Sequence, residues 1–72
     1  MNTATLISVT VNGEQRRVTA GASIADMLRE LGVDPAKVAV ERNLAIVPKS
    51  TLEDVPAADG DRFEIVHFVG GG

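Results

Sequence analysis

The pair Asn12-Gly13 constrains the beginning of the chain more than any other feature of the sequence. Before it, residues 6–11 alternate so that an isoleucine and two valines share one face of an extended chain, which predicts a β-strand. Asn-Gly favours a two-residue type I′ turn because both of its central positions need a positive φ. Residues 15–19 are therefore predicted to return along the first strand and close a β-hairpin.

A short helix is predicted directly after the hairpin. Ser23 can accept a hydrogen bond from a backbone amide of the first turn, and Asp26 suits the positive end of the helix dipole. Gly32 is placed to end the helix in a left-handed conformation, and Pro35 cannot continue it. One helical face is formed by four apolar residues: Ile24, Met27, Leu28 and Leu31. This helix is expected to cover one face of a sheet.

Three further strands are predicted after the helix, over residues 38–41, 45–47 and 62–69. The element order is then ββαβββ. A hairpin, a covering helix and further strands describe an α+β protein in which a mixed sheet of about five strands packs on one helix. The ubiquitin-like β-grasp fold has this order. A ferredoxin-like arrangement would need a second full helix, and the stretch that holds Pro48 and Pro56 offers none.

The composition fits one soluble globular domain. The chain has 72 residues, of which 44% are hydrophobic and 24% charged, and it contains no cysteine. Without cysteine there is no disulfide, no thiolate nucleophile and no thiolate metal ligand, so the cytoplasm is the predicted location. No run of apolar residues approaches the roughly 18 that a membrane-spanning helix needs, and we expect no membrane partner.

Charge and aromatic content argue against nucleic acid as a partner. The formal net charge is -3, so the field of the protein opposes the neutralisation of phosphates on which binding to nucleic acids depends. Two phenylalanines are the aromatic residues of the chain, which leaves no platform for stacking bases.

No set of residues predicts catalysis, a metal or a bound cofactor. His67 is the single histidine, and no nucleophile, base and orienting group can be assembled around it. A metal site needs further converging ligands that the sequence does not provide. The chain is therefore predicted not to be an enzyme. Six acidic residues are interpreted mainly as a solvated surface that can pair with a basic rim on partners: Glu41, Glu53, Asp54, Asp59, Asp61 and Glu64.

The chain ends in three glycines directly after a predicted apolar strand: Gly70, Gly71 and Gly72. We expect residues 1–69 to form the domain and residues 70–72 to form a flexible tail, because glycine passes where a branched residue would clash. Four extended residues beyond Phe68 reach roughly 13 Å. A carboxylate on Gly72 can then enter the active site of another protein. There a mixed anhydride such as an acyl-adenylate, made from ATP, would activate it for attack by a sulfur donor or an amine.

The last predicted strand also presents a candidate docking patch for the activating enzyme. Side chains alternate along it, so Val66 and Phe68 are exposed if Phe63 and Ile65 face the helix. Val69 extends this partner-binding surface towards the tail. Apolar side chains on an open sheet face beside a reactive terminus favour contact with a protein.

Four segments carry a resemblance to a known family: VNGE (residues 11–14), GASIADML (21–28), VAVERNLAIVPKS (38–50) and GDRFEIVHFVGGG (60–72). Through them the chain resembles the ThiS-type sulfur carriers of thiamine biosynthesis over essentially its whole length. The resemblance implies that an E1-like enzyme uses ATP to adenylate Gly72 and that a sulfur-donor enzyme supplies the sulfur of a thiocarboxylate. It also implies that thiazole synthase receives this sulfur. The Gly-Gly end of the family maps to Gly71 and Gly72.

Three alternatives share some of these features. The small subunit of molybdopterin synthase has the same fold and a Gly-Gly end, and the preference for thiamine depends on the segments ERNLAIVP and EIVHFVGGG. A ubiquitin-like protein modifier would use the same activated terminus with a lysine amine as the acceptor. A plain interaction module would bind partners through its sheet and carry an inert tail.

Overall fold

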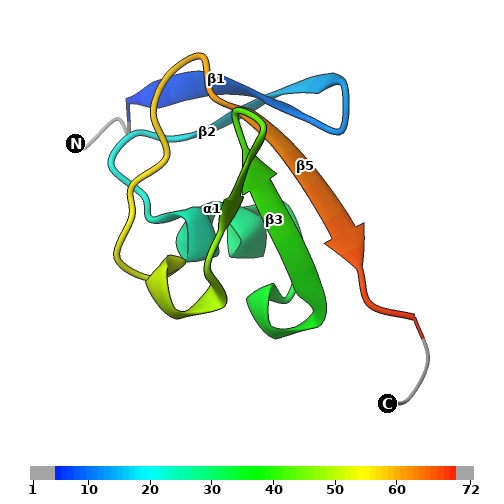
Figure 1. Cartoon of the computed structure of the whole chain (residues 1–72). Coiled ribbons are helices and arrows are strands. Elements are labelled where there is room, and N and C mark those ends of the chain that lie inside the picture. The colour runs from blue at the N-terminus through cyan, green and yellow to red at the C-terminus, as the bar shows by residue number, and fades with distance from the viewer. Residues whose placement is uncertain (1–4, 70–72) are drawn as a thin grey trace.

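The computed structural model describes residues 5–69 and shows a sheet packed against a helix (Figure 1). Its elements are β1 (Leu6–Val11), β2 (Glu14–Thr19), α1 (Ile24–Glu30), β3 (Val38–Arg42), β4 (Ala45–Val47), β5 (Arg62–His67) and the 3-10 turns η1 (Pro35–Lys37) and η2 (Lys49–Thr51). This order is ββαβββ, so the predicted β-grasp fold is confirmed. Gly70, Gly71 and Gly72 lie outside the described residues.

The sheet places the last strand of the chain in its middle. The strand order is β2-β1-β5-β3-β4, with β1 and β5 parallel and the other neighbours antiparallel. β5 ends at His67 and not at residue 69 as predicted. The reason is that its neighbour β3 begins at Val38, so the ladder stops there. Beyond the strand, the Phe68 N–H donates to the Lys37 carbonyl oxygen (3.0 Å).

The turn of the first hairpin also ties it to β5. Asn12 and Gly13 have φ values of 49° and 82°, which confirms the predicted type I′ geometry. The Asn12 side chain then reaches across the sheet. Its Oδ1 accepts from the Ile65 N–H (2.7 Å) and its Nδ2 donates to the Ile65 carbonyl oxygen (3.1 Å). Asn12 therefore forms part of the hairpin turn and, through its side-chain amide, holds the hairpin against β5.

The core lies between α1 and the face of the sheet that it covers. Alternate residues of the strands are buried, as expected for a sheet with one covered face. The predicted helical stripe is confirmed for Ile24, Met27 and Leu28, whereas Leu31 is partly buried and caps the helix. The most deeply buried apolar side chains come from both layers: Val9, Val18, Ile24, Ala25, Met27, Leu28, Val38, Val40 and Phe63. We call the opposite side of the sheet the open face.

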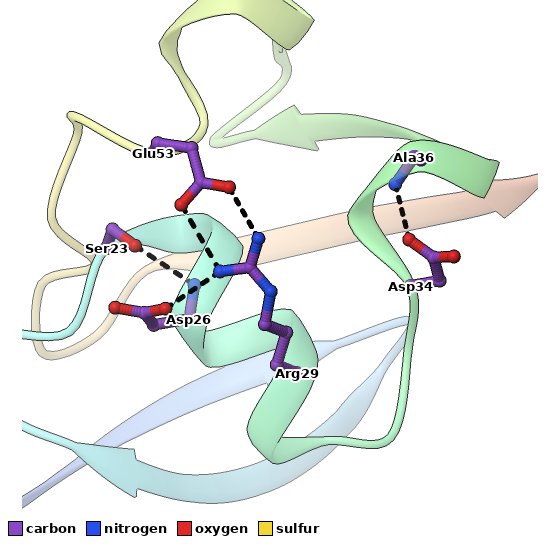
Figure 2. Close-up of polar contacts among 6 residues, drawn as sticks. All are labelled: Ser23, Asp26, Arg29, Asp34, Ala36 and Glu53. Atoms are coloured by element: carbon purple, nitrogen blue, oxygen red, sulfur yellow. Dashed lines mark hydrogen bonds and ion pairs between the residues drawn. The ribbon is translucent and has the colours of Figure 1, made fainter.

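Polar contacts and a glycine define the ends of α1. Ser23 Oγ accepts from the Asp26 N–H (3.0 Å), which confirms the predicted N-cap (Figure 2). Gly32 has a φ of 80°, as predicted for the residue that ends the helix. Arg29 forms an ion pair with Glu53, and this hydrogen-bonded contact lowers the pKa of the Glu53 carboxyl (Figure 2). Because both side chains are exposed, the ion pair stabilises the fold little.

A buried aspartate holds the second hairpin. The β3–β4 turn uses Asn43 and Leu44, which have φ values of 51° and 72°. Asp61 is only 6% exposed, and its Oδ1 accepts from Asn43 Nδ2 (3.1 Å). Its Oδ2 contacts Arg42 Nε (2.9 Å) and accepts from the Ala58 N–H (2.9 Å). The interpretation of Asp61 as a solvated surface residue was therefore wrong, because three donors converge on its carboxylate.

Candidate functional site

β5 brings the chain to the rim of the domain, next to the predicted tail. After the Phe68 backbone bond the chain moves away from the sheet (Figure 1). The side chain of Val69 is 97% exposed. Val69, the last described residue, therefore lies clear of the packed domain. The tail residues and the predicted modification site, Gly72, lie outside the described residues, so their roles stay predictions.

An apolar patch surrounds this exit on the open face. Phe63 and Ile65 are buried, and Val66 and Phe68 are 61% and 58% exposed, which confirms the predicted strand faces. Ala39 lies opposite Val66 in the β3–β5 register, so both side chains point to the same side. Ile46 of β4, which is 79% exposed, extends the surface beyond β3. We call this surface the exit patch: Ala39, Ile46, Val66 and Phe68.

Lys49, which the sequence did not indicate as a site residue, contacts part of the exit patch. Lys49 Nζ lies 4.6 Å from the centroid of the Phe68 ring and donates to the Ala36 carbonyl oxygen (2.9 Å). An open apolar groove continues from Phe68 along Lys49 towards Pro48 and Leu52. The cation–π contact is a surface interaction of about 0.5–1 kcal/mol. Its sequence signal, a lysine after Pro48, is too weak to predict a contact with a residue 19 positions away in the chain.

The described residues offer protein-contact features and not a metal centre. Within residues 5–69 no group of three His, Cys, Asp or Glu side chains is arranged to hold a metal ion. His67 is exposed at the end of β5. No helix in this part of the chain is long and apolar enough to cross a membrane. An exposed apolar patch at the end of a central strand is the feature most suited to recognition by another protein.

Comparison with known proteins assigns the chain to a family. Residues 9–72 match the sequence profile of the ThiS family. The chain belongs to the ThiS family. The match begins in β1 and includes the exit patch and the three terminal glycines of the sequence.

Curated relatives of this ThiS family member include a small carrier and a larger enzyme. The sulfur carrier protein ThiS of Bacillus subtilis is 44% identical over 50 residues, which are 69% of this chain and 76% of that protein. The thiazole synthase of Paramagnetospirillum magneticum is 53% identical over 66 residues, which are 92% of this chain. The chain spans only 20% of the length of that thiazole synthase.

A solved ThiS structure has the same fold. The crystal structure of the thiamine biosynthesis protein ThiS from Geobacter metallireducens matches with a TM-score of 0.77 and 29% sequence identity. The match covers 92% of this chain and 100% of that one. The structural similarity therefore extends over nearly the whole chain and is not confined to a part of the domain.

Proposed function

We propose that this ThiS family member is the sulfur carrier for the thiazole moiety of thiamine, and that Gly72 is its working residue. The observation that carries the proposal is the family match, which extends through the glycines that follow the exit patch. In the proposed cycle the Gly72 carboxylate attacks the α-phosphate of ATP on an E1-like enzyme and pyrophosphate leaves. A hydrosulfide ion supplied by a donor enzyme then attacks the acyl carbon, AMP leaves, a proton is released, and a thiocarboxylate remains.

The domain itself acts as a protein-bound cosubstrate and not as an enzyme. ATP is bound by the adenylating enzyme, and thiazole synthase is the acceptor of the sulfur. The similarity to a thiazole synthase that is about five times as long supports this partnership, since a similar segment is part of that polypeptide. The proposed location is the cytoplasm, which the use of ATP and the lack of cysteine in the sequence support.

Mass spectrometry of the intact protein tests the proposal. After incubation with the adenylating enzyme, ATP and a sulfur donor, we expect a species heavier by the difference between one sulfur and one oxygen atom. Fragmentation should locate this difference on Gly72, and a variant that lacks Gly71 and Gly72 should not acquire it. Adducts of the chain on lysines of other proteins, with no thiocarboxylate, would favour the protein-modifier alternative. An unchanged mass in the presence of active enzyme would contradict both.

The exit patch provides a second test of the proposed function. Replacing Val66 and Phe68 together with serine should weaken binding to the adenylating enzyme about tenfold or more, because exposed apolar anchors carry much of the energy of such contacts. The free energy of unfolding should change by less than ~1 kcal/mol, since both side chains are largely exposed and the cation–π contact of Phe68 with Lys49 is a weak surface contact. Calorimetric titration measures the binding, and thermal unfolding measures the stability.

Leu6 supplies the matched control for this experiment. It is 46% exposed on β1, which is separated from β4 by β5 and β3, and it lies outside the exit patch. Leu6→Ser should bind the adenylating enzyme as the wild type does. If Leu6→Ser and the double variant weaken binding equally, the exit patch has no special role.

A further inference from the structure

Two carboxylates face each other across the middle of the open face. Glu41 of β3 and Glu64 of β5 are direct partners in the antiparallel register. Their neighbours in each strand, Val40 and Ile65, are buried on the side of α1, so both glutamates point to the open face. Directly opposed residues have Cβ atoms about 5 Å apart, and like charges in this arrangement destabilise a sheet. The pair is therefore a local cost to the fold.

Among the described residues, no ion pair compensates this pair of carboxylates. Other acidic residues do have partners: Arg29 pairs with Asp26 and with Glu53, and Arg42 pairs with Asp61. Within residues 5–69, neither Glu41 nor Glu64 forms an ion pair or a side-chain hydrogen bond. Arg62 lies two residues before Glu64, on the same face and roughly 7 Å along the strand, and forms no ion pair with either carboxylate.

Exposed apolar side chains lie beside the two carboxylates. Ile46 lies opposite Glu41 in the β3–β4 register and is 79% exposed. Val66 follows Glu64 on the same face. Leu44, at the tip of the β3–β4 hairpin, is 92% exposed and lines a hollow together with Asn43, Arg62 and Glu64. Leu44 also has a φ of 72°, a conformation that favours asparagine or glycine, so a leucine is held there at a steric cost.

We propose that this surface binds the adenylating enzyme through an arginine that inserts between Glu41 and Glu64. We call the surface the carboxylate face: Glu41, Leu44, Ile46, Glu64 and Val66. A guanidinium group is planar and has five donors, so it can hydrogen-bond to both carboxylates at once. The ammonium group of a lysine is a point charge and suits this bridging geometry less well. The apolar side chains around it would exclude water and strengthen the contact. Glu41 and Glu64 repel each other in the free domain, and in the complex the arginine between them replaces this repulsion by attraction.

The charge of the chain favours the adenylating enzyme as the occupant. An enzyme that transfers a nucleotide from ATP must hold the phosphates with cationic groups, so the approach to its active site is positive. A carrier with a net charge of -3 is drawn towards such a site, and opposed carboxylates on the open face set its orientation. This inference depends on the proposed function, because it assigns a docking mode to the same partner.

The double variant Glu41→Gln/Glu64→Gln tests the inference, because it should move stability and binding in opposite directions. Glutamine keeps the size of the side chain and removes the repulsion, so the thermal midpoint should rise or stay the same. Binding to the adenylating enzyme, measured by calorimetry without ATP, should weaken about tenfold or more, and its dependence on salt should decrease.

A second variant with the same change in net charge separates a local effect from general attraction. Glu14 and Asp54 are exposed and lie outside the carboxylate face, so Glu14→Gln/Asp54→Asn serves as the control. It should retain binding within about twofold. Equal losses in the two double variants would show that only net charge matters and would overturn the arginine contact.

Three further results would overturn the inference. One is wild-type affinity of Glu41→Gln/Glu64→Gln for the adenylating enzyme. Another is a lower thermal midpoint of this variant, which would show that the pair is not repulsive. The third is weaker binding to thiazole synthase with unchanged binding to the adenylating enzyme, which would assign the face to another occupant. The proposed function is judged separately, by the mass increase at Gly72 of the wild type.

Discussion

Replacing Asp61 with alanine is expected to lower the free energy of unfolding by about 3 kcal/mol, which is a large part of the total stability of a domain of this size. The carboxylate is 6% exposed and accepts from Asn43, Arg42 and Ala58. Alanine leaves all three donors without this acceptor, and Arg42, whose side chain is only 28% exposed, loses its counter-charge. Removal of one partner from such a pair costs more than the pair contributes.

Thermal and denaturant unfolding followed by circular dichroism measure this effect. A loss of about 3 kcal/mol lowers the midpoint by roughly 15 °C in a chain of this length. Asp54→Ala is the control, because Asp54 is exposed, and it should change the free energy of unfolding by less than ~0.5 kcal/mol. An Asp61→Ala variant as stable as the control would mean that the network around Asp61 adds nothing to the fold.

The course of the chain could be predicted where local chemistry decides it. Asn12-Gly13 requires a tight turn, Ser23 caps a helix, and Gly32 ends it, and each of these residues acts on its immediate neighbours. The turn at Asn43 and Leu44 has no such signal, since leucine rarely takes a positive φ. Its geometry depends on the buried carboxylate of Asp61, which lies 18 positions from Asn43 in the sequence. Local patterns do not contain that contact.

Only part of the candidate site could be predicted, because here too local patterns do not contain the contacts between residues that are distant in the sequence. Alternation along one strand was enough to assign Val66 and Phe68 to the open face. The opposition of Glu41 and Glu64 depends on the register between β3 and β5, which is set by the packing of both strands on α1. The contact of Lys49 with Phe68 depends likewise on where η2 lies against β5. Composition and periodicity therefore indicate which side chains are exposed, and the fold decides which of them meet.

Gly71→Val should separate the chemistry of the tail from recognition of the domain. Gly71 precedes the proposed reacting residue, so any channel that leads to the nucleotide of the adenylating enzyme must enclose it. Valine adds a β-branched side chain and restricts φ, and the Gly72 carboxylate should no longer reach the α-phosphate in a productive geometry. We expect adenylation to fall about a hundredfold or more, since a misplacement of about 1 Å is enough for such a loss.

Binding and stability should survive the same change. The exit patch is untouched, so Gly71→Val should still bind the adenylating enzyme and act as a competitive inhibitor of wild-type charging, with an unchanged thermal midpoint. Gly71→Ala provides a graded control, because it adds a single carbon without β-branching and should lose less activity. ATP–pyrophosphate exchange with the partner enzyme measures the effect. Normal exchange by Gly71→Val would rule out a threaded tail, and a midpoint lowered by several degrees would show that Gly71 contributes to the fold.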